Sequence, residues 1–278
     1  MSLPQQAIIM ALIGGSAIVW LAIFRCLVAR QSIVPFEPRT RVPWTGIDVL
    51  LLVLALPLLD GMVFELARSR GTLPVGELSL DLLASLTAAR LMWSGLAIIY
   101  LEHRAGATAE DLGFDLQHLK QDARLGVLGF LAAILSVYGT EEIVVKLFPA
   151  GEHPLAKLVR EEYTPALMVV AAISAIFVAP LAEELVFRVV LQGWLERQID
   201  MLTEHRRIYG ERFARLFAIV ISAAAFAAMH RGYERIPIFV LGLILGYLYQ
   251  QTHRIFPSLI LHACFNGITI LFLVLEAT

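Results

Sequence analysis

The stretch VVAAISAIFVAPLAEELVFRVVL, residues 169–191, places two adjacent glutamates, Glu183 and Glu184, in the middle of an apolar run. About 20 apolar residues of helix cross a hydrocarbon core about 30 Å thick, so this run has the length of a transmembrane helix. A charged side chain near the bilayer centre costs roughly 2.5–3.5 kcal/mol on insertion scales. Ionisable residues kept inside a membrane helix mark a functional site by default, and the pair is the first candidate here.

The composition of the whole chain also indicates a membrane protein. Of the 278 residues, 58% are hydrophobic and 17% are charged, and the mean hydropathy is +0.74. Soluble domains have about 45–50% apolar and about 25% charged residues. The formal net charge of −2, without a basic patch interleaved with aromatic residues, argues against a nucleic-acid partner. Two cysteines cannot form a disulfide framework, which excludes the small disulfide-bonded class of domains.

Apolar runs long enough for a membrane helix recur along the chain. We therefore expect an all-α, polytopic membrane protein, a single membrane domain over residues 1–278 in which about eight transmembrane helices enclose an intramembrane active site. The third and fourth runs also contain charged residues. The eight runs fall at residues 6–29, 47–67, 80–101, 124–148, 166–196, 214–231, 235–250 and 256–275.

Three Glu-Glu pairs occur in the chain, and their surroundings differ. Glu161 and Glu162 lie in a polar connector, where we expect them to be solvated. Glu141 and Glu142 lie near the end of the fourth run, followed by Lys146, where long charged side chains can reach the membrane interface. Only the third pair has long apolar stretches on both sides, so it is the pair that requires an explanation.

Within the third pair the two glutamates have different neighbours. Arg188 follows Glu184 by four residues and shares its helical face, the favourable order for an ion pair. Glu183 is rotated by about 100° and lacks that partner, which favours a general base with a supporting neighbour. Pro180 removes a backbone hydrogen bond and is expected to open the helix locally. The alternative is a buried Glu–Arg pair that only holds helices together.

Two of the seven histidines lie in apolar segments. His230 ends the run VISAAAFAAMH, and His262 lies in SLILHACFN, four residues before Asn266 and on the same helical face. A membrane histidine can also serve only as a hydrogen-bonding group between helices. The other five lie in connectors and are expected to be solvated: His103, His118, His153, His205 and His253.

These residues resemble the motifs of a known family. The segments EELVFR (183–188), FAAMH (226–230) and HACFN (262–266) are similar to the motifs EExxxR, FxxxH and HxxxN of the CAAX protease and bacteriocin-processing family of intramembrane proteases. The resemblance covers roughly residues 165–270, which it identifies as the catalytic core. Residues 1–164 resemble the family only in being hydrophobic and would form variable N-terminal helices.

The resemblance implies hydrolysis of a peptide bond inside the membrane. Carried over by position, Glu183 and His230 would activate the attacking water. Glu184 and Arg188 would orient and support them. Each role agrees with the chemistry of the side chain, because a base and an orienting ion pair are what water activation requires.

The remaining two motif residues and the cofactor complete what the resemblance implies. His262 and Asn266 would stabilise the oxyanion or position the substrate carbonyl. A metal is left open: Glu183, His230 and His262 could supply the three protein ligands of a catalytic zinc ion. The spacing does not decide between such a divalent metal and no cofactor, and we favour a water activated by glutamate alone.

The predicted function is therefore that of an intramembrane endopeptidase in a multi-pass protein of the cell membrane. Its partners would be the lipid bilayer and a membrane-associated peptide or protein, with a prenylated CAAX protein as one substrate the resemblance allows. Two alternatives remain, a non-catalytic membrane scaffold or chaperone with a protease-like core and an ion-coupled transporter. Against the transporter, the motifs are not repeated in the first half of the chain, whereas many transporters contain duplicated halves.

Overall fold

The computed structural model describes residues 3–39, 41–70, 78–148, 154–206, 211–230 and 232–277, and within these ranges every regular element is a helix, as expected. The elements, in which η marks π-helical or 3₁₀ segments, are α1 (Leu3–Val28), α2 (Gly46–Ser69), α3 (Leu80–Tyr100), η1 (Leu101–Ala105), α4 (Leu119–Leu147), α5 (Pro154–Glu161), α6 (Pro165–Ala172), η2 (Ile173–Val178), α7 (Ala179–Glu184), η3 (Leu185–Gln192), α8 (Gly193–Arg206), α9 (Glu211–Ala228), η4 (Gly232–Glu234), α10 (Arg235–Thr252) and α11 (Ile255–Ala277).

Six helices in the described part of the chain are long and apolar enough to cross a membrane. They are Leu3–Val28, Gly46–Ser69, Leu80–Ala105, Leu119–Leu147, Pro165–Leu202 and Ile255–Glu276. They coincide with six of the eight expected runs. The expected run at 214–231, whose last residue lies outside the described ranges, corresponds to a shorter apolar helix, Arg215–Ala228. The run at 235–250 corresponds to α10, which is not among the six. The count of eight therefore stays a prediction.

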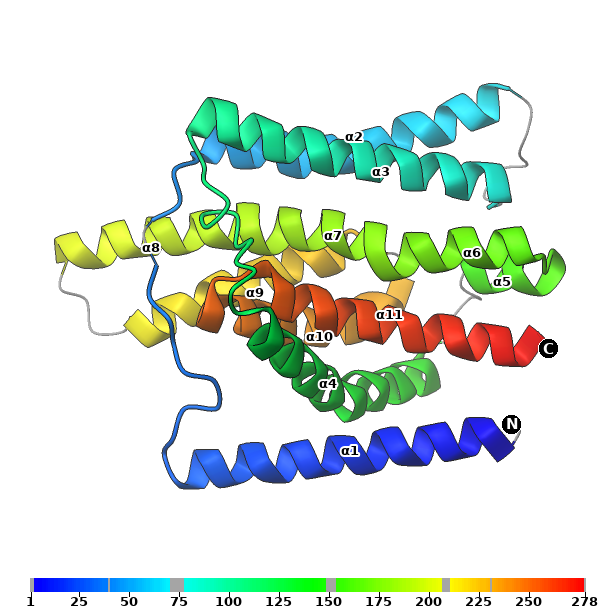
Figure 1. Cartoon of the computed structure of the whole chain (residues 1–278), viewed down its shortest axis with the longest axis horizontal. Coiled ribbons are helices and arrows are strands. Elements are labelled where there is room, and N and C mark those ends of the chain that lie inside the picture. The colour runs from blue at the N-terminus through cyan, green and yellow to red at the C-terminus, as the bar shows by residue number, and fades with distance from the viewer. Residues whose placement is uncertain are drawn as a thin grey trace.

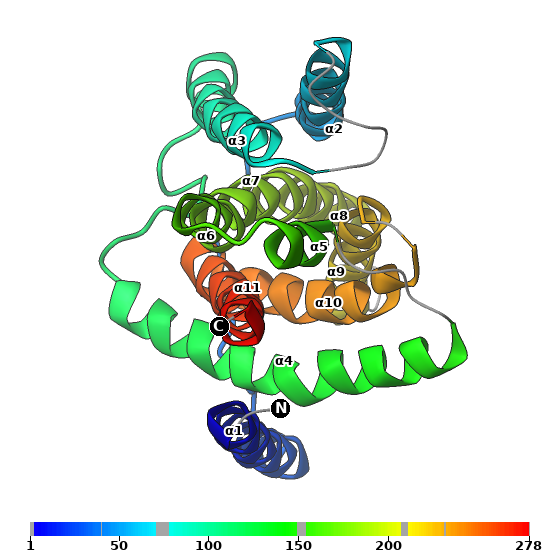
Figure 2. The ribbon, with the colours of Figure 1, turned by 90° about the vertical axis from the view of Figure 1, so that its right-hand side faces the viewer.

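The long helix Pro165–Leu202, made of α6, η2, α7, η3 and α8, runs through the middle of the molecule (Figure 1). Figure 2 shows α2 and α3 on one side of it and α9, α10 and α11 on the other. Helix α4 crosses over α10 and α11, and α1 packs on the outer side of α4. Both ends of the chain lie at the same end of the bundle in Figure 1. The central helix is thus covered from both sides, which buries Glu184 fully and Glu183 in part.

Apolar side chains cover the outside of the bundle as well as its core. Leu58, Met62 and Leu91 are each more than half exposed, although they lie on two of the six long apolar helices. Exposed side chains of this kind would be unfavourable in water and are suited to contact with lipid. The outer surface therefore agrees with an integral membrane protein.

Two glycines let the C-terminal helices approach their neighbours closely. A Cβ atom added to Gly126 on α4 would lie 2.7 Å from Ile260 Cβ, and one added to Gly242 on α10 would lie 3.0 Å from Ala223 Cβ. Small residues at such crossings allow tight packing of helices in a membrane. These contacts fix α11 against α4 and α10 against α9, and α11 carries two of the predicted site residues.

Candidate active site

Glu184 and Arg188 form the buried ion pair that their spacing predicts. Arg188 Nε donates to Glu184 Oε2 at 3.2 Å, and both side chains are fully buried. Arg188 Nη1 also donates to Ser222 Oγ on α9 at 3.0 Å, and the Ser222 hydroxyl donates to the Phe187 carbonyl at 2.7 Å. The charge is thus neutralised within one helix, while Ser222 ties that helix to α9.

His262 on α11 connects the two glutamates. Its Nδ1 lies 2.9 Å from Glu184 Oε1, and its Nε2 lies 3.7 Å from Glu183 Oε2. The ionised carboxylate of Glu184 can only accept, so Nδ1 carries the proton and donates it. The opposite ring nitrogen, Nε2, is thereby directed toward Glu183. The distance of 3.7 Å is too long for a direct hydrogen bond.

Glu183 has an ionic partner, which corrects the expectation that it is unpaired. Arg90 Nη1 on α3 lies 3.5 Å from Glu183 Oε1. The same guanidinium donates to Asp60 on α2, with Nη2 2.7 Å from Oδ2 and Nε 3.2 Å from Oδ1. The periodicity of one helix shows which of its own residues share a face, but it cannot show which other helix covers that face. Arg90 comes from a different span, so spacing within residues 169–191 could not reveal it.

The two carboxylates also differ in their exposure. The Glu184 side chain is fully buried, whereas 16% of the Glu183 side chain is exposed. Glu184 has its oxygens directed at Arg188 and His262, which leaves Glu183 as the carboxylate of the pair that a small molecule can reach. Glu184 is therefore the buried carboxylate that contacts Arg188 and His262, and Glu183 is the accessible one.

His230 lies beside this group but is not bonded to it. It follows the end of α9 and is half-buried, and its Nδ1 lies 3.0 Å from the Phe226 carbonyl oxygen. The Phe226 ring stands edge-on to both His230 and His262, with ring centroids 5.0 Å and 5.7 Å apart. Among the described residues, no hydrogen bond or ion pair joins His230 to Glu183. His230 is connected to His262 through the ring of Phe226, which contacts both histidines.

Asn266 supports an irregular turn of the central helix. The turn before Pro180 is π-helical, so the Ala175 carbonyl would accept from the backbone nitrogen of residue 180, where proline has no hydrogen. Asn266 Nδ2 donates to that carbonyl at 2.7 Å. The local opening expected from Pro180 is therefore present, and one amide hydrogen of Asn266 is engaged in satisfying it.

The three metal-ligand candidates do not form a metal site in this arrangement. Within the described ranges, no group of three or more histidine, cysteine, aspartate or glutamate side chains is placed to hold a metal ion. Glu183 and His262 lie together, but His230 is directed at its own helix. As placed here, the three side chains do not converge on one point, so the chemistry below is derived from the side chains alone.

Sequence reasoning missed three residues that contact the site: Asp60, Arg90 and Ser222. Asp60 and Arg90 are charged residues within expected membrane runs, the same signal that singled out the Glu183–Glu184 pair. That signal could have found them. Ser222 carries no such signal, because a serine in a membrane helix can bond to its own backbone.

One connector histidine also differs from its expectation. His103 and His118 are exposed, as expected, and His153 and the His205 side chain lie outside the described residues. His253 is only 8% exposed, because it caps the end of α10 and its ring contacts Glu196 on α8. A chain position between two helices does not ensure contact with water.

Comparison with known proteins agrees with the motif residues. Residues 165–268 match the family model described as type II CAAX prenyl endopeptidase Rce1-like. A search of curated proteins and a search of solved structures each found no match. The matched stretch begins with α6 and ends within α11, so it contains all three motifs but neither Asp60 nor Arg90. The resemblance predicted from the motifs is thereby confirmed over residues 165–268, which are similar to this family of endopeptidases.

Proposed function

We propose that this protein is an intramembrane endopeptidase in which Glu183 activates water to hydrolyse a peptide bond of a membrane-associated substrate. The family match supports a protease. The observation that carries the mechanism is the position of Glu183, accessible and opposite His262 Nε2, while Glu184 holds the other side of that ring.

The gap between Glu183 and His262 suits a water molecule. Oε2 and Nε2 are 3.7 Å apart, so one water can hydrogen-bond to both atoms. Glu183 takes a proton from this water while the water oxygen attacks the carbonyl carbon of the peptide bond. The C–N bond then breaks, and the proton passes from Glu183 to the leaving amine. A single carboxylate thus acts first as base and then as acid.

The other motif residues have supporting roles in this proposal. Glu184 and Arg188 orient His262, as their contacts suggest. In this proposal His262, together with Glu183, binds and activates the water. The family resemblance alone gives that role to His230. His230 and the second amide hydrogen of Asn266 are then the donors for the substrate carbonyl and the oxyanion that forms from it.

The family match and the apolar surroundings of the site support a proposal for the substrate class. The matched model describes an endopeptidase for prenylated CAAX proteins, and a lipid-anchored C-terminal segment is suited to a site inside a bilayer. We therefore propose a membrane-tethered peptide or prenylated protein as substrate and the cell membrane as location.

The test is cleavage of a tethered peptide by the full chain in lipid nanodiscs. A farnesylated CAAX peptide and the same peptide without its lipid distinguish the substrate class. Glu183→Ala is expected to lower turnover by about 10²- to 10⁴-fold, the range of general acid–base catalysis. His230→Ala is expected to lower it by about 10²- to 10³-fold, the range for loss of one oxyanion donor. Glu142→Ala, which removes an exposed glutamate of another Glu-Glu pair, is the control and should leave turnover unchanged.

The outcomes separate the competing functions. Unchanged turnover in both site variants would refute the enzyme assignment of these residues. No turnover of any tethered peptide by the unmodified protein would favour the scaffold or chaperone. Activity that a chelator abolishes and zinc restores would contradict the mechanism without a metal. Ion flux in liposomes that disappears with Glu183→Gln would favour the transporter.

A further inference from the structure

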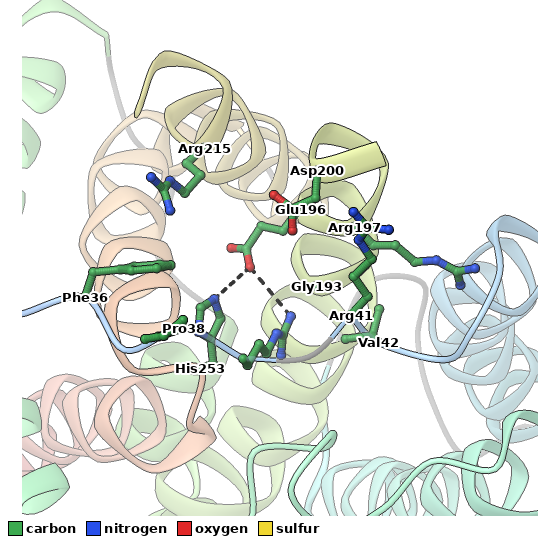
Figure 3. A pocket seen from close by; sticks show the side chains of 11 residues that line it. Phe36, Pro38, Arg41, Val42, Gly193, Glu196, Arg197, Asp200, Arg215 and His253 are labelled. Carbon is green, nitrogen blue, oxygen red and sulfur yellow. Dashed lines mark hydrogen bonds and ion pairs between the residues drawn. The ribbon is translucent and has the colours of Figure 1, made fainter. Parts of the chain in front are cut away.

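A second polar region lies beside α8, apart from the three motifs, and surrounds a cavity of about 190 Å³ (Figure 3). This volume is well above the roughly 10–15 Å³ that a single water needs, so the cavity can admit a small polar group. Four arginines and two carboxylates line it, so the lining has an excess of positive charge. The lining residues are Phe36, Pro38, Arg39, Arg41, Val42, Gly193, Glu196, Arg197, Asp200, Arg215 and His253.

The buried carboxylate of the cavity, Glu196, already has partners. Glu196 Oε1 accepts from Gln192 Nε2 at 3.0 Å. Glu196 Oε2 lies 3.2 Å from His253 Nε2 and 3.6 Å from Arg39 Nη2, the contacts drawn as dashed lines in Figure 3. Both carboxylate oxygens are thus engaged by groups of the protein, which reduces the repulsion that an anion in the cavity would meet.

Arg39 contributes a charged N–H donor to the cavity, and this donor has no hydrogen-bond acceptor among the described residues. Its Nη1 donates to the Tyr249 hydroxyl at 2.7 Å, but its buried Nη2 has no hydrogen-bond partner among the described residues. Burial lowers the pKa of Arg39, yet Tyr249 and Glu196 outweigh that effect and hold the pKa above its usual value. Gly193 leaves space for this group, since a Cβ atom there would lie 2.8 Å from Nη2.

Three more arginines stand around the cavity. Arg197 donates to the backbone carbonyls of Pro43 and Trp44, which fixes the connector between α1 and α2 against α8. Arg215 stacks over the ring of Phe36, with Cζ 4.5 Å from the ring centroid. Arg41 and Arg215 also interact electrostatically with Asp200, the second carboxylate of the lining. Arginine is the side chain best shaped for the oxygens of a phosphate.

The cavity lies at one end of the bundle, where the central helix leaves its apolar part. The central helix has 38 residues, more than the roughly 20 needed to cross a bilayer, and its last segment, α8, is rich in polar residues. The connector 29–45, α8 and the turn between α10 and α11 meet at this end (Figure 1). If the long apolar helices cross a bilayer, we expect this end of the bundle to lie at the level of the lipid headgroups.

We propose that this cavity binds a phosphate group, that of an anionic phospholipid at this face of the membrane. Basic pockets between membrane helices bind lipid headgroups through their phosphates. Arg39 Nη2 supplies the buried donor, and Arg41 and Arg215 add positive charge to the lining beyond what Asp200 balances. A free phosphate ion shares this chemistry and is the other source to be tested. The site is separate from Glu183, so the proposal does not depend on protease activity.

The experiment compares lipid retention by full-length proteins that differ only in this cavity. Each protein is reconstituted with phosphatidylcholine and phosphatidylglycerol, extracted into detergent, and examined by native mass spectrometry for bound lipid. The unmodified protein is expected to retain phosphatidylglycerol. Arg41→Gln combined with Arg215→Gln should weaken its affinity by roughly 25-fold, about fivefold for each arginine.

A matched control removes the same charge outside the cavity. Arg30→Gln combined with Arg104→Gln removes two exposed arginines, one just after α1 and one in η1, neither of which lines the cavity. This variant should retain phosphatidylglycerol as the unmodified protein does. Gly193→Ala removes no charge but displaces Arg39, and it should also weaken retention. Equal retention in all variants, or equal loss in the control, overturns the proposal.

A second arm distinguishes the lipid from free phosphate. Delipidated protein is heated with inorganic phosphate or with a short-chain phosphatidylglycerol, and the shift in Tm is recorded. Stabilisation by the lipid that requires Arg41 and Arg215 supports the headgroup. Equal stabilisation by inorganic phosphate, with the same dependence on the two arginines, overturns the lipid source.

Discussion

Two buried clusters on the central helix are built from the same kinds of side chain. In each, a buried glutamate contacts an arginine and a histidine, and the histidine comes from the C-terminal part of the chain. The clusters are Glu184 with Arg188 and His262, and Glu196 with Arg39 and His253. One lies within the matched motifs, and the other lines the basic cavity.

The difference lies in the second nitrogen of each histidine. His253 has both ring nitrogens on protein oxygens, with Nδ1 2.7 Å from the Glu37 carbonyl and Nε2 3.2 Å from Glu196. His262 has one nitrogen on Glu184, while the other is directed at the accessible Glu183 across 3.7 Å. Similar residues thus form a closed structural cluster in one place and leave a ring nitrogen without a hydrogen bond to the described residues in the other, where the proposed mechanism has a water molecule.

The largest expected effect comes from exchanging the two histidines for glutamine. His262→Gln removes the ring nitrogen opposite Glu183 and should lower turnover by about 10²- to 10⁴-fold. His253→Gln should lower it less than about tenfold, because that ring only holds structure. Initial rates of tethered-peptide cleavage, corrected for folded protein by size-exclusion chromatography, measure both. Equal losses in the two variants would show that the comparison is wrong.

Stability should separate the two arginines. Arg188→Met leaves Glu184 fully buried without its cation and should destabilise the fold by about 3–5 kcal/mol. Arg39→Met should cost about 1–3 kcal/mol, because Glu196 keeps its bonds to Gln192 and His253. Reversible unfolding in mixed detergent micelles gives both free energies. Adding Glu184→Gln to Arg188→Met should recover part of the loss, and no recovery would contradict a buried ion pair.

A smaller effect is expected at Arg90, which holds Glu183 from another helix. Arg90→Gln should lower kcat by about tenfold, equivalent to about 1.4 kcal/mol, since the accessible carboxylate loses its positioning ion pair. KM should change little if Arg90 does not touch substrate. Arg68→Gln is the control, because Arg68 pairs with Glu65 on the exposed surface of α2. A kcat of Arg90→Gln equal to that of this control would show that Arg90 does not position Glu183.

The smallest effect is expected at the Glu141–Glu142 pair. Lys146 Nζ lies 2.8 Å from Glu142 Oε1, and both side chains are about 70% exposed. Exposed ion pairs contribute little to stability. Lys146→Gln should therefore change neither Tm nor turnover measurably. A clear loss of either would mean that this end of α4 has a role that its exposure does not indicate.

Relations within one helix could be predicted from the sequence. The Glu184–Arg188 pair follows from a spacing of four residues, and the structure confirms it. The exposure of Glu161 and Glu162 follows from their polar surroundings and is also confirmed. The family resemblance rested on three short motifs, and the match over residues 165–268 confirms it.

Relations between helices could not be predicted in the same way. The contact of Arg90 with Glu183 depends on how α3 packs against α7, which no periodicity within either helix specifies. The bond from Asn266 to the Ala175 carbonyl depends on a π-helical turn, where the free carbonyl lies one residue earlier than in an α-helix. The catalytic roles of the motif residues stay predictions.

The bridge from Asp60 through Arg90 to Glu183 has a consequence for exchanging parts between proteins of this kind. The three motifs lie within residues 165–268, but the counter-ion of Glu183 comes from α3 and is itself held by α2. A chimera that joined this stretch to foreign N-terminal helices would keep every motif and still separate Glu183 from its cation. Such a hybrid should insert into the membrane but have a low turnover. Restoring an arginine on the helix that faces Glu183 should raise that turnover.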